Sequence, residues 1–182
     1  KDDIFLTSIY EKLTYFSQTY PRILERRMVI QSVKDITKKI KVWGNSDGID
    51  GFKPFYQGPL RGNKALISAY SNSKINLHDN THGLACHTRV FESIASVSKV
   101  FTHSSGVRDS KFGGLDDLGD ILNVVGIFDK NNISSVLTEE IENWNSTTYS
   151  KELTSKLWKA RDVVLEKHNW RVRAEKICEV LR

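Results

Sequence analysis

The chain has 182 residues, of which 39% are hydrophobic and 27% are charged. This balance excludes a disordered or fibrous protein, and no stretch approaches the run of about 20 apolar residues that spans a membrane. Cys86 and Cys178 are too few for a disulfide scaffold, so a reducing, cytoplasmic location is expected. The chain begins at Lys1 without a methionine, which favours a fragment of a larger two-lobed protein.

The positive charge is concentrated at the C-terminal end. Residues 1–150 carry 18 Lys/Arg against 17 Asp/Glu, whereas residues 151–182 carry 9 against 5. A basic tail can contact nucleic acid or an anionic membrane surface. No aromatic RNA-binding signature or groove-reading helix accompanies it. We therefore expect no nucleic-acid partner, and we interpret the tail as a solvated helix face rather than a membrane contact.

The first part of the chain is predicted to form a β-α-β unit. A short apolar run predicts a strand over residues 3–7, followed by a loop with a helical turn over 8–20. Pro21 suits the first turn of a helix, and apolar residues at helical spacing continue that helix to Lys39. A second strand is predicted over 40–43, and a long glycine-rich loop follows from Gly44 to Gly62.

Strands and helices alternate through the rest of the chain. Strands are predicted over residues 74–78, 99–103 and 123–128, and helices over 65–73, 88–96, 131–144, 150–167 and 171–181. Such alternation indicates a mostly parallel sheet flanked by helices. The predicted fold class is α/β and Rossmann-like, with residues 1–150 as the core of a single domain and 151–182 as a C-terminal helical extension.

A candidate phosphate site lies at the start of the predicted helix over 88–96. Thr88 is a plausible N-cap, and the free backbone N–H groups of a helix N-terminus, together with Arg89, suit a diphosphate. Glu92 lies one turn further on, and its carboxylate can accept hydrogen bonds from both hydroxyls of a ribose. The same spacing also fits a simple surface ion pair between Arg89 and Glu92, which remains the alternative.

Several metal-ligating side chains lie close together in the sequence: His78, His82, Cys86 and His87. Asn80 and Gly83 argue against a continuous helix here, and no second cluster completes a zinc site, so no metal is expected. His78 and His103 each end a predicted strand, where they can donate a hydrogen bond or act as a general base. Purely structural roles for both histidines remain equally open.

Standard nucleotide and hydrolase motifs are missing from the sequence. It has no Gly-x-Gly-x-x-Gly fingerprint, no P-loop, no nucleophile elbow and no kinase signature. Five other motifs occur in order: Val42-Trp43-Gly44; Tyr56-Gln57-Gly58-Pro59-Leu60-Arg61-Gly62; Tyr70-Ser71-Asn72-Ser73-Lys74-Ile75-Asn76-Leu77; His87-Thr88-Arg89-Val90-Phe91-Glu92-Ser93-Ile94-Ala95; and Arg161-Asp162-Val163-Val164-Leu165-Glu166-Lys167-His168-Asn169-Trp170 followed by Arg173-Ala174.

In this order the motifs resemble the C-terminal half of group 1 glycosyltransferases of the GT-B fold, especially the branch that includes spore maturation protein B. The resemblance covers about residues 40–182. It implies the donor-binding lobe of an enzyme that transfers a hexose-type sugar from a nucleotide-sugar donor, without metal or other cofactor, to an unknown acceptor. An N-terminal lobe of the same enzyme is the implied partner, and a non-catalytic nucleotide-binding or assembly module of the same fold is the alternative.

The resemblance also implies roles for particular residues. Glu92 matches the glutamate that usually holds the donor ribose, while no catalytic residue can be assigned. Two departures stand out: Leu84 replaces a second glutamate, and Ser96-Val97-Ser98-Lys99 replaces the usual Gly-Gly after Ala95, which predicts an altered turn near the phosphates. The expected donor-binding residues are Gly44, Asn76, His78, His87, Thr88, Arg89 and Glu92.

Overall fold

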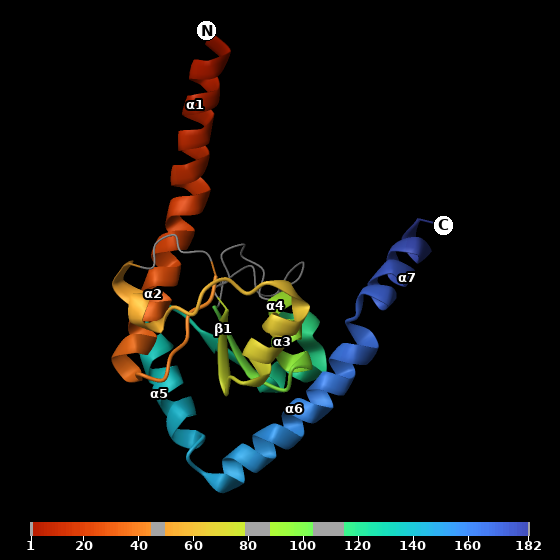
Figure 1. Ribbon diagram of the computed structural model, residues 1–182. Helices are drawn as coiled ribbons and strands as arrows, with labels where there is room; N and C mark the ends of the chain where they lie inside the picture. Colours follow the sequence, from red (N-terminus) through yellow and green to blue (C-terminus); the bar gives the residue numbers. More distant parts are fainter. Residues whose placement is uncertain (1, 45–49, 79–87, 104–114, 182) are drawn as a thin grey trace. The chain divides into compact units, whose positions relative to one another are not determined.

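The computed structural model describes residues 2–44, 50–78, 88–103 and 115–181 (Figure 1). The chain divides into two compact units, Lys1–Pro59 and Leu60–Arg182. The boundary falls within the stretch that the sequence predicts as a long loop, where few packing constraints cross. The prediction of a single domain over 1–182 stays a prediction.

The first unit begins with a run of helix rather than with a strand. Helix α1 (Asp2–Thr14) continues through a π-helical turn, η1 (Tyr15–Thr19), into α2 (Tyr20–Ile36). The predicted strand over 3–7 and the predicted loop over 8–20 are therefore wrong, whereas the helix predicted from Pro21 is confirmed. A short apolar run has no period that separates strand from helix, and the acidic residues Asp2 and Asp3 favour a helix N-terminus.

The π-helical turn coincides with a cluster of aromatic side chains. The backbone N–H of Tyr20 donates to the carbonyl of Tyr15, one residue further back than in an α-helix. The ring centroids of Tyr15 and Phe16 lie 5.5 Å apart, and those of Phe16 and Tyr20 lie 6.2 Å apart. Pro21 follows directly, and a widened turn relieves the clash that a proline makes with the preceding turn of a helix.

A strand is predicted in the remainder of the first unit, but its described residues form an isolated bridge there. Val42 pairs with Tyr56 in an isolated parallel bridge, with η2 (Asp50–Phe55) just before Tyr56. The Val42 N–H donates to the carbonyl of Phe55 and the Gln57 N–H donates to that of Val42, both at 2.9 Å. The predicted strand over 40–43, and with it the predicted β-α-β unit, is therefore wrong.

The second unit contains a parallel sheet, as predicted, but the sheet has three strands instead of the five that the sequence predicts. Strands β1 (Ile75–His78), β2 (Lys99–His103) and β3 (Val125–Phe128) lie in the order β1-β2-β3. Leu77 lies opposite Phe101, and Phe101 lies opposite Gly126. The predicted α/β class with a parallel sheet flanked by helices is confirmed, and the three strands begin within two residues of their predicted starts.

The middle strand carries the core on both of its faces. Successive residues of a strand point to opposite faces, and the adjacent Val100 and Phe101 are 0% and 2% exposed. Val100 belongs to a cluster with Val90 of α4 (Thr88–Ala95) and Leu157 of α6 (Thr147–Lys167). A strand that is buried on both faces does not alternate between apolar and polar residues, and β2 has the adjacent apolar residues Val100 and Phe101 between the buried polar residues Lys99 and Thr102.

The other helices of the second unit are α3 (Gly62–Ser71), α5 (Ile133–Asn143) and α7 (Trp170–Val180). A short 3₁₀ segment, η4 (Leu115–Val124), kinks at Gly119 and leads into β3. In Figure 1 the long helix α6 runs past α4, and its buried stripe, Leu153, Leu157, Ala160 and Val164, packs on the core. The predicted C-terminal helical extension thus completes the core.

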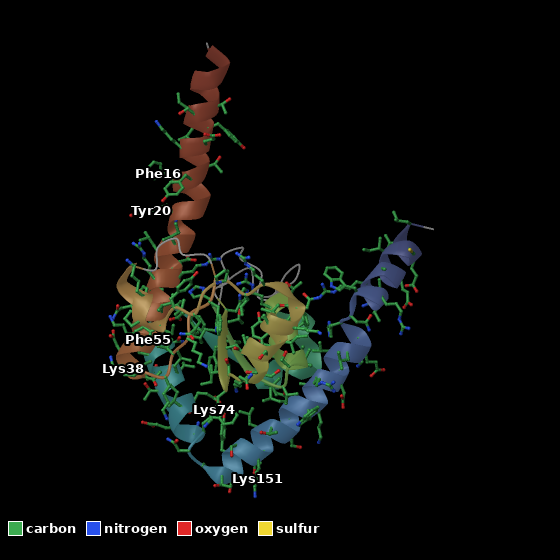
Figure 2. The ribbon with its side chains drawn as sticks, viewed as in Figure 1. Phe16, Tyr20, Lys38, Phe55, Lys74 and Lys151 are labelled. Atoms are coloured by element: carbon green, nitrogen blue, oxygen red, sulfur yellow. The ribbon has the colours of Figure 1, made fainter. Side chains whose placement is uncertain are left out.

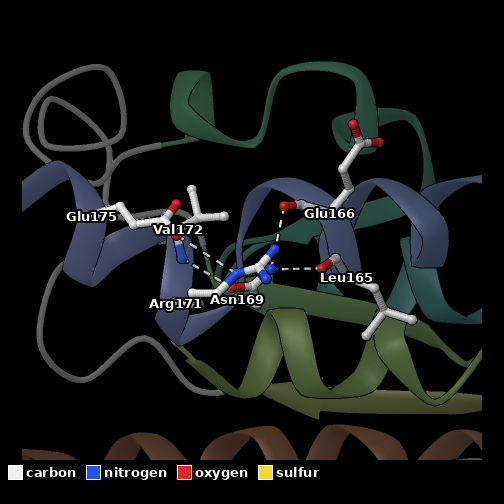
Figure 3. A network of polar contacts seen from close by, with 6 residues as sticks. All are labelled: Leu165, Glu166, Asn169, Arg171, Val172 and Glu175. Carbon is white, nitrogen blue, oxygen red and sulfur yellow. Dashed lines mark hydrogen bonds and ion pairs between the residues drawn. The ribbon is translucent and has the colours of Figure 1, made fainter.

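One side chain fixes the corner between α6 and α7 (Figure 3). The Asn169 carboxamide donates to the carbonyls of Leu165, at 2.7 Å, and Glu166, at 3.3 Å, and accepts from the N–H of Val172 at 2.9 Å. A single residue therefore satisfies orphan carbonyls at the end of one helix and an orphan N–H at the start of the next.

Among the described residues, no helix is long and apolar enough to cross a membrane.

Candidate functional site

The candidate site is built on the N-terminal end of α4. This helix is amphipathic: Val90 and Ile94 are completely buried against the sheet, while Arg89 is exposed. The helix begins at Thr88, one residue earlier than predicted, so Thr88 is the first helical residue rather than the predicted N-cap. In a parallel sheet the following helix runs back, so its N-terminus lies at the carboxyl edge of the strands, which is the usual place for a nucleotide site.

The carboxyl edge of the sheet also holds the two predicted histidines. His78 ends β1 and is buried, and His103 ends β2 and is partly exposed. His78 lies in register with Thr102, and the ring of His103 makes an edge contact with Phe128 at 5.5 Å. The structure therefore brings His78 and His103 to one edge of the sheet, where the sequence predicts them.

Glu92 and Tyr70 are brought together by the packing of α3 on α4. The Tyr70 hydroxyl donates to a carboxylate oxygen of Glu92 at 3.5 Å. Burial, with a further contribution from the Glu92 charge, raises the pKa of Tyr70 to about 12, and the nearby Arg89 charge acts in the opposite direction. Arg89, Glu92 and Tyr70 thus form one electrostatically coupled group, in which Tyr70 remains a neutral hydrogen-bond donor at neutral pH.

Tyr70 is a member of this group that the sequence does not predict. It falls inside a quoted motif, but its partner lies on another helix, and no local pattern links the two. A hydroxyl that contacts the carboxylate restricts the rotamers of Glu92 and leaves part of its accepting capacity for a ligand. The contact with Glu92 thus places the Tyr70 hydroxyl in this group.

Asn76 has a partner at the other end of α4. Its carboxamide donates to the Ser98 hydroxyl at 2.8 Å, and that hydroxyl donates to the carbonyl of Ser73 at 2.6 Å. Ser98 follows the C-terminal end of α4, whereas Thr88 begins the helix. This chain of hydrogen bonds ties β1 to the turn that enters β2, and it separates Asn76 from the group around Glu92.

The other two predicted donor-binding residues are Gly44 and His87. Gly44 belongs to the first unit, where its φ of 133° requires glycine. Its N–H donates to the carbonyl of Gly58 at 3.2 Å, and its own carbonyl accepts the Tyr56 hydroxyl at 2.7 Å. His87 lies outside the described residues.

Most of the candidate metal-ligating side chains lie outside the part of the chain that the structure describes. Of the four side chains considered, His82, Cys86 and His87 lie outside the described residues, and only His78 is described. Within residues 2–44, 50–78, 88–103 and 115–181, no group of three or more His, Cys, Asp or Glu side chains is arranged to hold a metal ion.

The motif that starts at His87 and the motif that starts at Arg161 lie far apart in the sequence, but they contact each other through Phe91. The ring of His168 stacks on Phe91 with centroids 4.9 Å apart. The Arg173 guanidinium lies 5.3 Å from the Phe91 ring and 5.2 Å from the Trp170 ring, so it is held between two aromatic faces. The corner of α6 and α7 is thereby attached to the same helix that carries Arg89 and Glu92.

The turn after α4 contains a left-handed backbone position that glycine usually occupies, and in this chain the residue there is Val97. Val97 has a φ of 57°, its N–H donates to the carbonyl of Ile94, and the Ser98 N–H donates to that of Ser93. These bonds define a Schellman motif, in which the left-handed position is usually glycine. Since α4 rises about 1.5 Å per residue, this turn lies at the opposite end of the helix from Thr88. The predicted effect of this turn on bound phosphates stays a prediction.

Taken together, these elements define an α/β protein with a small parallel sheet, compatible with a Rossmann-like fold, and with polar groups gathered at the start of α4. Comparison with protein-family models, curated proteins and solved structures finds no match to this chain.

Proposed function

We propose that the second unit binds a nucleotide-sugar donor at the N-terminal end of α4 and serves as the donor-binding lobe of a GT-B type glycosyltransferase. The observation that carries the proposal is the coupled group of Arg89, Glu92 and Tyr70 beside the first turn of this helix. The order of the sequence motifs, which resembles that of group 1 glycosyltransferases, supports the same assignment.

Each part of the ligand has a chemical counterpart in this group. The diphosphate meets the backbone N–H groups of the first turn and the exposed Arg89 guanidinium, both of which favour negative charge. The ribose hydroxyls donate to the Glu92 carboxylate, which Tyr70 holds in place. In a transfer reaction the cationic groups would stabilise the diphosphate leaving group as its bond to the sugar breaks.

The direct test is calorimetry of the whole chain with UDP-, GDP- and TDP-sugars. We expect Glu92→Ala to weaken binding about tenfold or more, since it removes charge-assisted hydrogen bonds worth about 1.5–3 kcal/mol. Arg89→Ala should weaken binding by a similar factor and also reduce its dependence on salt.

Matched controls on other helices separate this site from general charge effects. Glu139→Ala on α5 and Lys156→Ala on α6 remove exposed charges of the same sign elsewhere, and both should leave the affinity unchanged. Absence of binding for every donor, or equal losses in the controls, would contradict the assignment. If the protein binds donor but transfers no sugar when combined with its second lobe, the non-catalytic alternative holds instead.

A further inference from the structure

A second polar site lies at the opposite edge of the sheet from α4's first turn. A pocket of about 440 Å³ is lined by Lys74, Trp144, Ser150, Lys151 and Thr154. Lys74 directly precedes β1, Trp144 follows α5, and the other three residues belong to the first turns of α6. The pocket is therefore at the amino ends of the strands, and its volume falls within the roughly 300–1,000 Å³ of small-molecule sites.

Two ammonium groups line this pocket without a counter-charge. Lys74 and Lys151 are both exposed, and Figure 2 shows them at the same end of the second unit. Within the described part of the chain, neither lysine forms an ion pair. Glu140, one turn before Trp144 on α5, is already held by Lys99 and Tyr149. The pocket is therefore electropositive and suits an anion.

The remaining groups define the body of the ligand. The Ser150 hydroxyl donates to the carbonyl of Thr147 at 3.1 Å, and the Thr154 hydroxyl donates to that of Ser150 at 2.7 Å. Because both hydroxyl protons are used within the helix, their oxygens are left as acceptors for a ligand that carries hydroxyl groups.

Trp144 supplies an apolar wall of the pocket. The Lys74 ammonium lies 5.3 Å from the centroid of its ring, so the ring orders that lysine at the pocket. The Trp144 indole N–H is buried and meets no acceptor among the described residues.

From these groups we infer that the pocket binds a small sugar phosphate, with the phosphate between Lys74 and Lys151 and the sugar hydroxyls donating to Ser150 and Thr154. The inference is independent of the proposed donor site, since the pocket shares no residue with it and lies at the other edge of the sheet.

The test is calorimetry of the whole chain at low ionic strength with glucose 6-phosphate, inorganic phosphate and glucose. We expect saturable binding of glucose 6-phosphate, weaker binding of inorganic phosphate and no binding of glucose. Lys74→Met and Lys151→Met should each weaken the binding about fivefold, the effect of losing about 1 kcal/mol from an exposed charge pair. Lys159→Met, an exposed lysine further along α6, serves as the matched control and should have no effect.

Three results would overturn the inference. If glucose 6-phosphate shows no saturable binding, the pocket is not a binding site. If inorganic phosphate binds as tightly as glucose 6-phosphate, the sugar does not contribute to recognition. Loss of binding in Arg89→Ala but not in Lys74→Met would assign the phosphate to α4 instead. Circular dichroism of each lysine variant checks that the fold is retained, and an exposed lysine replaced by methionine gives no reason to expect unfolding.

Discussion

Lys99 and Glu140 form an ion pair inside the second unit, with Nζ 3.5 Å from Oε2 and the two side chains only 10% and 8% exposed. The Tyr149 hydroxyl lies 2.9 Å from both carboxylate oxygens. Burial is the largest cause that raises the pKa of Tyr149, followed by its hydrogen bond to Glu140. The ion pair joins the start of β2 to α5, and the contact between Tyr149 and Glu140 adds α6. These three elements meet at the amino edge of the sheet.

Removing one charge from this pair should destabilise the protein strongly. We expect Glu140→Gln to lower the free energy of unfolding by about 3–5 kcal/mol, because it leaves the Lys99 ammonium buried without a counter-charge. Urea denaturation measures the change. Glu139→Gln, its exposed neighbour on α5, should alter stability by less than about 0.5 kcal/mol. Similar denaturation midpoints for the two variants would contradict the role of the pair.

The pKa of Tyr70 should report the charge of Glu92. In the native protein it is raised from 10.0 to about 12, with burial as the largest cause and the Glu92 charge next. Glu92→Gln should therefore lower the pKa of Tyr70 while leaving it above 10.0, since burial remains. An NMR titration of the tyrosine ring carbons, assigned with Tyr70→Phe, measures the pKa of Tyr70. An unchanged pKa in Glu92→Gln would show that the Glu92 charge does not act on Tyr70.

The same shift predicts a dependence of stability on pH. Because the folded-state pKa of Tyr70 is higher than the unfolded value, the stability that it contributes is fully present below pH 10 and is lost as the pH rises toward 12. Tyr70→Phe should flatten the alkaline part of a plot of unfolding free energy against pH. An identical alkaline decline in this variant would assign the loss to other groups.

Gly126 is required by the packing of β3 on β2. A Cβ at this position would collide with the ring of Phe101, which is buried in the core and cannot move aside. We expect Gly126→Ala to cost about 1–3 kcal/mol or more, as other overpacked cores do. Gly51→Ala is the control, since a Cβ there meets no atom within 4 Å. Equal thermal midpoints for the two variants would contradict the collision.

Val97 should tolerate replacement by glycine better than any buried valine of the sheet. Its left-handed φ of 57° costs about 1–2 kcal/mol for a residue with a Cβ, and glycine removes that strain while losing part of the apolar packing. Val97→Gly should change the free energy of unfolding by less than about 1 kcal/mol. Val100→Gly, in the buried strand β2, should cost about 3 kcal/mol or more.

The result for these two valines tests the Schellman geometry directly. Calorimetric unfolding of both variants gives the comparison under one condition. If Val97→Gly is as destabilising as Val100→Gly, the apolar contact of Val97 outweighs its backbone strain. In that case, the turn after α4 depends on the side chain rather than on the left-handed backbone.

The sequence by itself determined the elements whose signal is local. Helices α4 and α6 carry apolar residues at helical spacing, so the face that each buries can be read directly from the residues, and β2 has two adjacent apolar residues at its centre. The same local signal failed over residues 3–7, because a short apolar run suits a strand and a helix turn equally well. It also failed over residues 40–43, where Val42 forms an isolated bridge with Tyr56.

The tertiary structure alone decided which side chains meet. Tyr70 contacts Glu92, Asn76 contacts Ser98, and Arg173 lies between Phe91 and Trp170, although nothing in the spacing of these residues links them. Such contacts depend on how helices and strands pack across the core, and packing is a property of the whole folded unit. The sequence therefore identified Arg89 and Glu92 as candidates, and the packing of α3 and α4 decided that Tyr70 contacts Glu92.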